Sequence, residues 1–310
     1  MSAASNRSGL CRRSLAAPDS SRSAAIWQTH LRGPGVGRLI PFIGLALLGL
    51  VVGAYGTLIG AGGGFVLVPV LLLLYPHDTP AKLTAISLAV VFANASSGSF
   101  SYYRLRRADY RSGLWLAAAT LPGGVVGAIV VNAIPRGAFE VIMGTALLAV
   151  GSYLLVRPST RMPLLTSARF VAERTITDSS GRSYSYRFNL GLAMLLSVGV
   201  GFLSSVLGIG GGIIHVPLLT TFFSFPEHIA TATSHFVLMF MAGAATGTHA
   251  VEGDYANSVA ITIALGVGVL AGAPIGAAIS NRIRGLWIVR LLAVALGIVG
   301  VRLLLVALLS

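Results

Sequence analysis

Apolar and polar positions fall into long blocks along this chain, and most apolar blocks are as long as a membrane-spanning helix. A helix needs about 20 residues to cross a hydrocarbon layer roughly 30 Å thick. The blocks 65–75 and 213–224 are shorter, about 17 Å as helices, and each follows a glycine cluster. We therefore expect two short helices inside the protein, among longer spans. The apolar segments are 39–58, 65–75, 83–103, 112–131, 137–156, 189–207, 213–224, 231–249, 256–280 and 286–307.

The composition excludes a soluble protein. Of the 310 residues, 55% are hydrophobic and 10% are charged, and the mean hydropathy is +0.83. Soluble domains carry about 25% charged residues. The 38 glycines agree with this, because glycine is more frequent in membrane helices than in soluble ones. The sequence predicts an all-α, polytopic transmembrane helical bundle in contact with the lipid bilayer.

Charged residues lie mainly outside the apolar blocks. The net charge is +13, and the basic residues sit in a few loops and the N-terminal tail without interleaved aromatic residues. Such residues are typical orientation signals of membrane proteins, so we expect no nucleic-acid partner. The chain divides into a disordered Arg/Ser-rich tail (1–38), a first transmembrane repeat (39–156), a polar, basic, cytoplasmic linker (157–188) and a second transmembrane repeat (189–310).

The two transmembrane halves share a series of landmarks in the same order. Gly60-Ala61-Gly62-Gly63-Gly64-Phe65 matches Gly208-Ile209-Gly210-Gly211-Gly212-Ile213 at a shift of 148 residues. Val68-Pro69 matches Val216-Pro217 at the same shift, and Thr84 and Ser87 match Thr231 and Ser234 at 147. A near-constant shift indicates an internal duplication.

The number of crossings per half decides how the repeats are oriented. Five crossings invert the second repeat, whereas four leave the two repeats parallel. Short arginine-rich loops stay in the cytoplasm. Five crossings place the Arg104–Arg111 loop, the linker and Arg282/Arg284 there, with Asp254 outside, but they also export the arginines of the tail. Four crossings keep the tail inside and export Arg282 and Arg284. We expect inverted repeats of five plus five segments, with four plus four as the alternative.

The glycine clusters are candidate substrate-binding elements. Without side chains, their backbone N–H groups can face a ligand, and a helix that begins just after them favours an anion at its N-terminus. Inverted repeats bring two such helix ends together in many secondary transporters. Close helix packing is the alternative role for these glycines. The candidates are Gly60, Gly62, Gly63 and Gly64 in the first half, and Gly208, Gly210, Gly211 and Gly212 in the second.

A polar stripe on the following helix of each half adds further candidates. Hydroxyl and amide groups can donate hydrogen bonds to an anion without placing a permanent charge in its path, although they also join membrane helices to one another. Histidines within spans are functional candidates because ionisable residues are rare there. The stripe residues are Ser87, Asn94, Ser97 and Ser234, and the histidines are His215 and His235.

Metal and other cofactors are not expected. The single cysteine, Cys11, lies in the tail, and no carboxylate or thiol completes a ligand set with His215 and His235. His235 and His249 lie about 21 Å apart along one helix, so they cannot share an ion.

The paired motifs resemble those of the TauE/SafE family of sulfite exporters. The similar stretches are G-A-G-G-G-F-V-L-V-P (60–69) and G-I-G-G-G-I-I-H-V-P (208–217), each followed by a T-x-x-S helix, and the resemblance covers roughly residues 40 to 308. It implies transport of a small anion, such as sulfite, a sulfonate or another organic anion, across a plasma membrane, in bacteria the inner membrane. The chain departs from an exact repeat at His235, where the first half has Leu88, and at His215, where it has Leu67.

We therefore predict a secondary transporter, an exporter by the family's name, that works by alternating access at a site between the two glycine-broken helices. The coupling ion stays open between a proton and Na⁺, with His215 and His235 as candidates for the proton, and the oligomeric state is not predicted. A passive anion channel is one alternative. An intramembrane enzyme that uses Ser204 or Ser205 with His215 is another, although a third group to orient the histidine is missing.

Overall fold

The computed structural model describes residues 36–156, 170–280 and 286–309. Contacts divide the chain into Met1–Ile43 and Gly44–Ser310, and the architecture below is that of the second unit. The expected disordered tail (1–38) therefore lies almost entirely outside the described residues. So do Arg282 and Arg284, on which part of the orientation argument depends.

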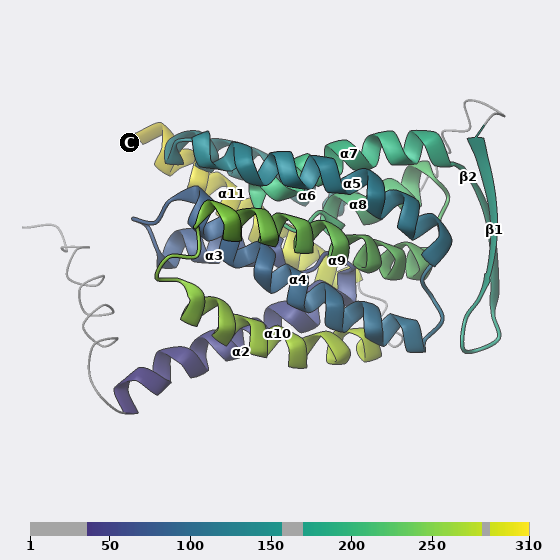
Figure 1. Cartoon of the computed structure of the whole chain (residues 1–310), viewed down its shortest axis with the longest axis horizontal. Helices are drawn as coiled ribbons and strands as arrows, with labels where there is room; N and C mark the ends of the chain where they lie inside the picture. Colours follow the sequence, from purple (N-terminus) through teal and green to yellow (C-terminus); the bar gives the residue numbers. More distant parts are fainter. Residues whose placement is uncertain (1–35, 157–169, 281–285, 310) are drawn as a thin grey trace, which may run out of the picture. The chain divides into compact units, whose positions relative to one another are not determined.

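The protein is an all-α, polytopic helical bundle, as the sequence predicts (Figure 1). Within the described residues, six helices are long and apolar enough to cross a membrane, namely α2, α4, α5, α7, α9 and α10. The two short expected segments form α3 and the pair α8–η3. The helices are α2 (Val36–Ile59), α3 (Gly64–Leu74), α4 (Pro80–Arg104), α5 (Tyr110–Val130), α6 (Arg136–Val156), α7 (Leu190–Leu207), α8 (Gly212–Pro217), α9 (Glu227–Glu252), α10 (Val259–Ile279) and α11 (Leu286–Leu309), with a 3₁₀ turn η1 (Val131–Ala133) and a π-helical turn η3 (Leu218–Phe222).

Local sequence signals set several helix ends. Thr79, Asp109 and Asn189 are N-caps whose side chains accept hydrogen bonds from backbone N–H groups of the first turns of α4, α5 and α7. Gly208 and Gly253 end α7 and α9 in the left-handed conformation, which glycine adopts without steric cost.

The predicted polar linker contains a β-hairpin that the sequence analysis missed. Strand β1 (Val171–Thr177) pairs antiparallel with β2 (Ser183–Asn189). Alternate aromatic residues of β2 pack on the segment before α9, with ring centroids 4.4 Å apart for Tyr186 and Phe225 and 4.8 Å apart for Phe188 and Phe225. This apolar face gives the hairpin a buried side, so the region is not simply a polar connection.

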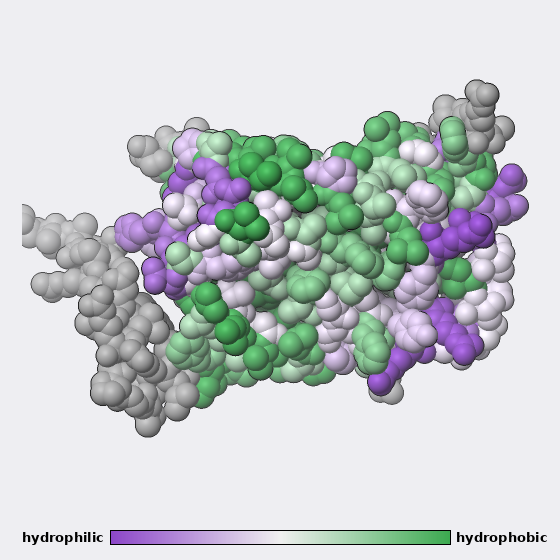
Figure 2. All heavy atoms as spheres, viewed as in Figure 1, coloured by the Kyte–Doolittle hydropathy of each residue, from purple (hydrophilic) through white to green (hydrophobic). Residues whose placement is uncertain are grey.

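The connections gather at two ends of the bundle. At the hairpin end, the Ser179 N–H of the hairpin turn donates to the Leu105 carbonyl of the α4–α5 loop, at 3.1 Å. At the Asp254 end, Asn132 after α5 approaches Asp254 after α9, at 3.4 Å. Figure 2 shows hydrophilic residues at both ends and apolar residues between them, the surface expected of a protein that spans a bilayer.

The short helices α3 and α8–η3 run toward opposite ends. The last carbonyl groups of α3 accept hydrogen bonds from Arg136, which also binds the Asp78 carbonyl at the Asp254 end. By contrast, Phe223, just after η3, contacts Phe188 at the hairpin end. Corresponding elements of the two halves thus point in opposite directions, as an inverted repeat requires; the duplication itself stays a prediction.

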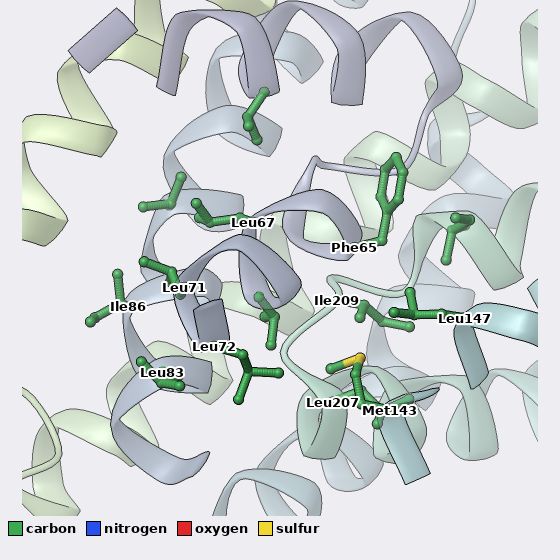
Figure 3. Packing of buried hydrophobic residues seen from close by; sticks show 14 of the residues in the cluster. Phe65, Leu67, Leu71, Leu72, Leu83, Ile86, Met143, Leu147, Leu207 and Ile209 are labelled. Atoms are coloured by element: carbon green, nitrogen blue, oxygen red, sulfur yellow. The ribbon is translucent and has the colours of Figure 1, made fainter. Parts of the chain in front are cut away.

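Helix α3 is embedded between the halves. Phe65, Leu67 and Leu71 are fully buried in a cluster that includes residues of α4, α6 and the end of α7 (Figure 3). An isolated helix of this length is marginal in water. Its position therefore depends on the packing of both halves around it.

Small residues let helices of different halves approach closely. A β-carbon added at Gly123 of α5 would overlap the Val198 carbonyl of α7, and one at Gly272 of α10 would overlap the Leu50 carbonyl of α2. Helix α5 thus packs on α7, and α10 packs on α2. One helix of each half thus packs against a helix of the other half, so the halves cannot separate without losing these contacts.

We expect Gly201→Ala to destabilise the protein and Gly199→Ala to leave it unchanged or slightly more stable. Both glycines lie in α7, but a β-carbon at Gly201 would overlap the Thr120 carbonyl, whereas nothing lies within 4 Å of one at Gly199. Overpacking of this kind costs about 1–3 kcal/mol. Thermal unfolding of both variants in detergent measures the difference. Equal melting temperatures would contradict this packing.

The hairpin is fastened by a buried carboxylate. Asp178 accepts hydrogen bonds from the Ser180 hydroxyl and from the N–H groups of Ser180 and Arg182, and it lies 3.6 Å from the Arg107 guanidinium. The Ser180 hydroxyl, these N–H groups and the Arg182 charge lower the pKa of Asp178 from 3.8 to about 2, although burial raises it. Because the folded-state pKa is depressed, the carboxylate stabilises the hairpin above pH 4, and this stabilisation is lost as the pH falls toward 2.

Hydrogen exchange of the hairpin amides should therefore speed up between pH 4 and pH 2, after correction for the intrinsic rates. Asp178→Asn should remove this pH dependence. Glu173→Gln is the matched control, because Glu173 is exposed and its ion pair with Arg187 contributes little. The same acid response in Asp178→Asn would show that another group is responsible.

Candidate functional site

The two glycine clusters lie directly against each other. A β-carbon added at Gly64 would lie 2.5 Å from the Gly208 carbonyl oxygen, and one at Gly212 would overlap the Gly60 carbonyl. The first glycine break (Gly60–Gly64) and the second (Gly208–Gly212) are both buried. Sequence positions 148 residues apart thus meet in one place, with no space for a side chain between them.

The breaks use backbone conformations that favour glycine. Six glycines have positive φ angles, between 65° and 85°. After them, α3 and α8 begin without a side-chain cap. The glycines are Gly60, Gly62 and Gly63 in the first break and Gly208, Gly210 and Gly211 in the second.

Several backbone donors at the breaks stay free. Among the described residues, no carbonyl accepts from the N–H groups of Gly63, Gly64 and Phe65, or from those of Gly210, Gly211 and Ile213. Unpaired buried N–H groups are costly and rare in proteins. These six donors lie at or just before the starts of α3 and α8, where the helix dipole adds positive potential.

Two carbonyl groups at the breaks are paired with serines, whereas those of Ala61, Gly62 and Ile209 accept from no described residue. Ser87 of α4 donates to the Gly208 carbonyl at 2.6 Å, and Ser234 of α9 donates to the Gly60 carbonyl at 3.4 Å. Each serine comes from the half opposite to its acceptor. The break region therefore offers mainly donors to a ligand.

Asn94 adds a side-chain donor on α4. Its Oδ1 accepts from the Thr57 hydroxyl at 3.1 Å, and Tyr102 donates to the Thr57 carbonyl at 2.9 Å. Asn94 is fully buried, and its Nδ2 has no partner in the described part of the chain. The amide is thus held through one end and left free at the other.

His235 of α9 lies beside the first break and against α4. A β-carbon added at Gly98 would lie 2.5 Å from its ring, and Tyr102 packs edge-on against it with ring centroids 5.7 Å apart. The Gly60 carbonyl interacts with the ring, but neither ring nitrogen makes a well-formed hydrogen bond to a described residue. The ring therefore joins the first break to α4.

Two of the candidate residues have other partners. The Ser97 hydroxyl donates to the Leu270 carbonyl of α10 at 3.1 Å, which directs it to a helix contact rather than to the breaks. His215 Nε2 lies 3.3 Å from the Ser197 hydroxyl, which itself donates to the Ala193 carbonyl. These contacts do not place Ser97 or His215 next to the unpaired N–H groups of the breaks.

The serine–histidine pairing considered from the sequence is not formed. His215 contacts Ser197, whereas the hydroxyl groups of Ser204 and Ser205 are buried without a partner among the described residues. A β-carbon at Gly211 would lie 2.6 Å from Ser204 Oγ, so this hydroxyl borders the second break.

The sequence analysis missed Thr57. Thr57 and Ser205 are 148 residues apart, the shift that relates the two glycine motifs, and both side chains are fully buried next to the breaks. Extending the repeat alignment by one helical turn would have found this pair.

Chemically, the site is a set of neutral hydrogen-bond donors. The buried charged residues of the described chain, Arg107, Asp109, Glu140 and Asp178, lie near the two ends and not at the breaks. No group of three or more His, Cys, Asp or Glu side chains suited to a metal ion occurs among the described residues. The arrangement can bind an anion through N–H and O–H groups and helix dipoles.

Known proteins give an independent comparison. Residues 45–303 match the family described as sulfite exporter TauE/SafE. The chain is 31% identical over 268 residues to the probable membrane transporter protein YunE of Bacillus subtilis, which covers 84% of this chain and 97% of that protein. It is 27% identical over 180 residues to the probable membrane transporter protein MJ0441 of Methanocaldococcus jannaschii, covering 56% of this chain and 60% of that protein. No solved structure matches.

Proposed function

Because this chain belongs to the sulfite exporter TauE/SafE family of membrane proteins, we propose that it is a secondary transporter for a small anion, with a binding site between the two glycine-broken helices that forms when the two breaks move apart. A transporter role is what the family and its relatives support. The anion, the direction of transport and alternating access are our proposals.

The observation that carries the proposal is the imbalance of donors and acceptors at the breaks. The Gly60 and Gly208 carbonyls accept from serine hydroxyls. Six N–H groups and the Asn94 Nδ2 have no acceptor among the described residues, and they outnumber the three carbonyls (Ala61, Gly62 and Ile209) that have no donor there. A cation such as Na⁺ would need free oxygen atoms, whereas an anion needs donors. The free groups therefore favour an anion as the ligand.

A sulfur oxyanion fits this donor set. Sulfite and sulfonates present three oxygen atoms in different directions, and the donors come from both breaks and from α4. Neutral donors hold such an ion without a fixed positive charge, so release stays possible. Export is the direction that the family's name suggests, and the plasma membrane is the expected location.

Alternating access agrees with the opposed directions of α3 and α8–η3. The breaks are fully buried in this conformation, so an anion enters or leaves only when neighbouring helices move. Movement of one half against the other would open the site toward one end at a time.

A transport assay tests the proposal directly. The purified protein is reconstituted in liposomes, and uptake of labelled sulfite, sulfate, sulfoacetate and acetate is compared with that of empty liposomes. We expect saturable uptake and exchange of one or more of these anions. Uptake without saturation or countertransport would instead indicate a channel, and a lack of any uptake would contradict the proposal.

We expect Asn94→Ala to raise the KM for the anion about 10- to 100-fold. A hydrogen bond to a charged group contributes about 1.5–3 kcal/mol, and this substitution removes the free Nδ2 donor. Ser96→Ala is the matched control on the same helix, because the Ser96 hydroxyl donates only to the Phe92 carbonyl. Concentration dependence of uptake by both variants measures the effect. Similar KM values for Asn94→Ala and the wild type would remove Asn94 from the site.

A further inference from the structure

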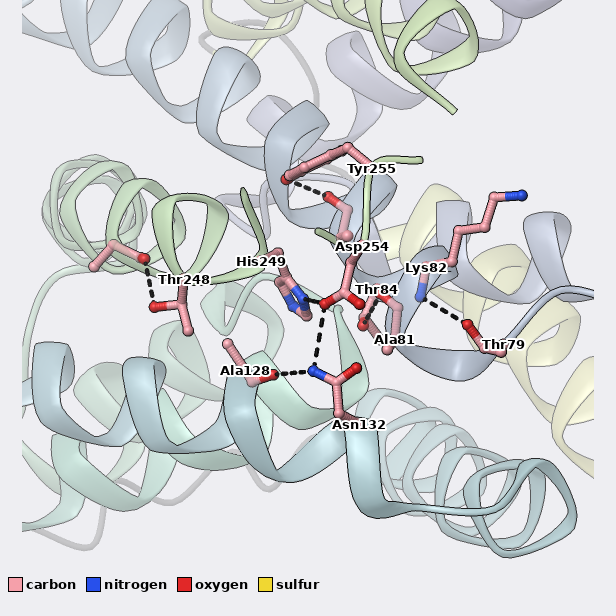
Figure 4. Close-up of polar contacts among 12 residues, drawn as sticks. Thr79, Ala81, Lys82, Thr84, Ala128, Asn132, Thr248, His249, Asp254 and Tyr255 are labelled. Carbon is pink, nitrogen blue, oxygen red and sulfur yellow. Dashed lines mark hydrogen bonds and ion pairs between the residues drawn. The ribbon is translucent and has the colours of Figure 1, made fainter. Parts of the chain in front are cut away.

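A buried histidine–carboxylate pair closes the Asp254 end of α9. His249 is fully buried in the last turn of this helix, and its Nδ1 lies 2.7 Å from Asp254 Oδ2 (Figure 4). The Asp254 side chain keeps 13% of its surface exposed. The pair thus links a buried ring to the aqueous side through one carboxylate.

The surroundings of His249 are apolar apart from a few named groups. One turn away, Ala245 packs with Leu88 of α4 and Ala128 of α5. The charges that act on the ring are those of Asp254 and Glu252. Helix α5 and η1 contribute the neutral amide of Asn132, which donates to Asp254 at 3.4 Å.

No cation from α4 competes for Asp254. The nearest one on that helix, Lys82, is paired with Asp78 at 2.9 Å, and its side chain points away from the pair in Figure 4. With neutral imidazole and ionised carboxylate, the pair carries one negative charge. Binding one proton on His249 makes it neutral, and the carboxylate stabilises the imidazolium.

The other two span histidines are less suited to hold a proton. His215 contacts a serine hydroxyl, and His235 contacts a carbonyl and an aromatic ring. In the described part of the chain, neither has a carboxylate partner. A buried imidazolium without one is strongly disfavoured.

We propose that His249 and Asp254 hold the proton that is coupled to anion transport, in place of His215 or His235. This rests on the transporter function proposed above. An imidazole takes up and releases a proton at a single ring nitrogen, and here the Asp254 carboxylate lies against the ring and balances the added charge.

The structure also connects this pair to the helices of the anion site. The turn after α9 is tied to the first half, because Tyr255 donates to the Ala85 carbonyl of α4 at 3.0 Å and Asn132 binds Asp254. Ser234, which caps the Gly60 carbonyl, lies on the same α9 helix, about 22 Å away along its axis. A shift of α9 along its axis at the Asp254 end would therefore also move Ser234, which donates to the Gly60 carbonyl.

Protonation changes the balance between conformations. His249 Nε2 has no partner among the described residues. In the imidazolium this nitrogen carries a proton, so the closed conformation leaves a buried N–H without an acceptor, which is unfavourable. A conformation in which this nitrogen reaches water binds the proton more tightly, and proton binding favours that conformation in turn.

Coupled transport in liposomes tests the inference. A pH difference of one unit is imposed across the membrane, and equal K⁺ with valinomycin holds the membrane potential at zero. The probes are the labelled sulfite, sulfate, sulfoacetate and acetate of the first assay. One coupled proton per anion gives about tenfold accumulation at equilibrium, since one pH unit corresponds to a tenfold ratio. The side of the membrane on which the anion accumulates distinguishes symport with the proton from antiport against it.

His249→Gln and Asp254→Asn should still exchange the anion at equal pH and accumulate it less than about twofold under the gradient. His77→Gln is the matched control, an exposed histidine next to Asp78 near the same end, and should accumulate the anion like the wild type. Exchange at equal pH shows that a variant is folded. If His249→Gln does not exchange, Asp254→Asn decides the question.

The outcomes separate the two proposals. Wild-type exchange without accumulation under the gradient, or full accumulation by a folded His249→Gln or Asp254→Asn variant, would overturn the proton site and leave the transporter standing. A wild type that exchanges none of the four anions would overturn the transporter and the proton site together.

Discussion

Buried backbone groups must be paired where no water can reach them, and the two glycine breaks satisfy this constraint only in part. The Gly60 and Gly208 carbonyls find serine hydroxyls from the opposite half, while the N–H groups at the starts of α3 and α8 find no acceptor among the described residues. Such an arrangement survives only where the surrounding packing imposes it. The embedded α3 helix and the contacts of α5 with α7 and of α10 with α2 provide that packing, and the unpaired donors are the basis of the anion site that we propose.

Most of the fold could be predicted from the sequence, because the lipid environment leaves few alternatives for long apolar segments. The short helices α3 and α8–η3 were evident from length and from the preceding glycines. The hairpin was not, since the alternation of Tyr184, Tyr186 and Phe188 is brief and lies within a polar, arginine-rich region. Side-chain partners were harder still. Ser97 and His215 are residue types that binding sites use, but their contacts lie elsewhere. The Ser97 hydroxyl donates to a carbonyl of α10, and the His215 ring contacts Ser197. Thr57 is found only when the repeat alignment is extended, and the pairing of His249 with Asp254 depends on the turn at Gly253 that follows α9.

The two glycine breaks are alike in backbone conformation and unlike in chemistry. Both breaks have glycines of positive φ at equivalent places. The first break nevertheless contacts His235 and follows Thr57, whose hydroxyl donates to Asn94, whereas the second break borders the hydroxyl of Ser204. An anion between them would meet different donors on its two sides. Such asymmetry lets the two open conformations differ in affinity, which a transporter needs if binding on one side is to be followed by release on the other.

The two ends of the bundle differ in the same way. The hairpin end is closed by aromatic packing and by Asp178, whose pKa of about 2 keeps it ionised at every pH a cell experiences. The Asp254 end is closed by a histidine–carboxylate pair and by neutral hydrogen bonds to α4 and α5. The hairpin end is closed by aromatic packing and an ionised carboxylate, with the exposed His228 beside them. The Asp254 end is closed by a buried imidazole, which gains a charge when it binds a proton. Among the described residues of these two closures, only the Asp254 end has a buried imidazole hydrogen-bonded to a carboxylate. A proton bound there changes the charge of that closure, so a difference in pH across the membrane can act on one conformation more than on the other, and this difference is what coupling requires.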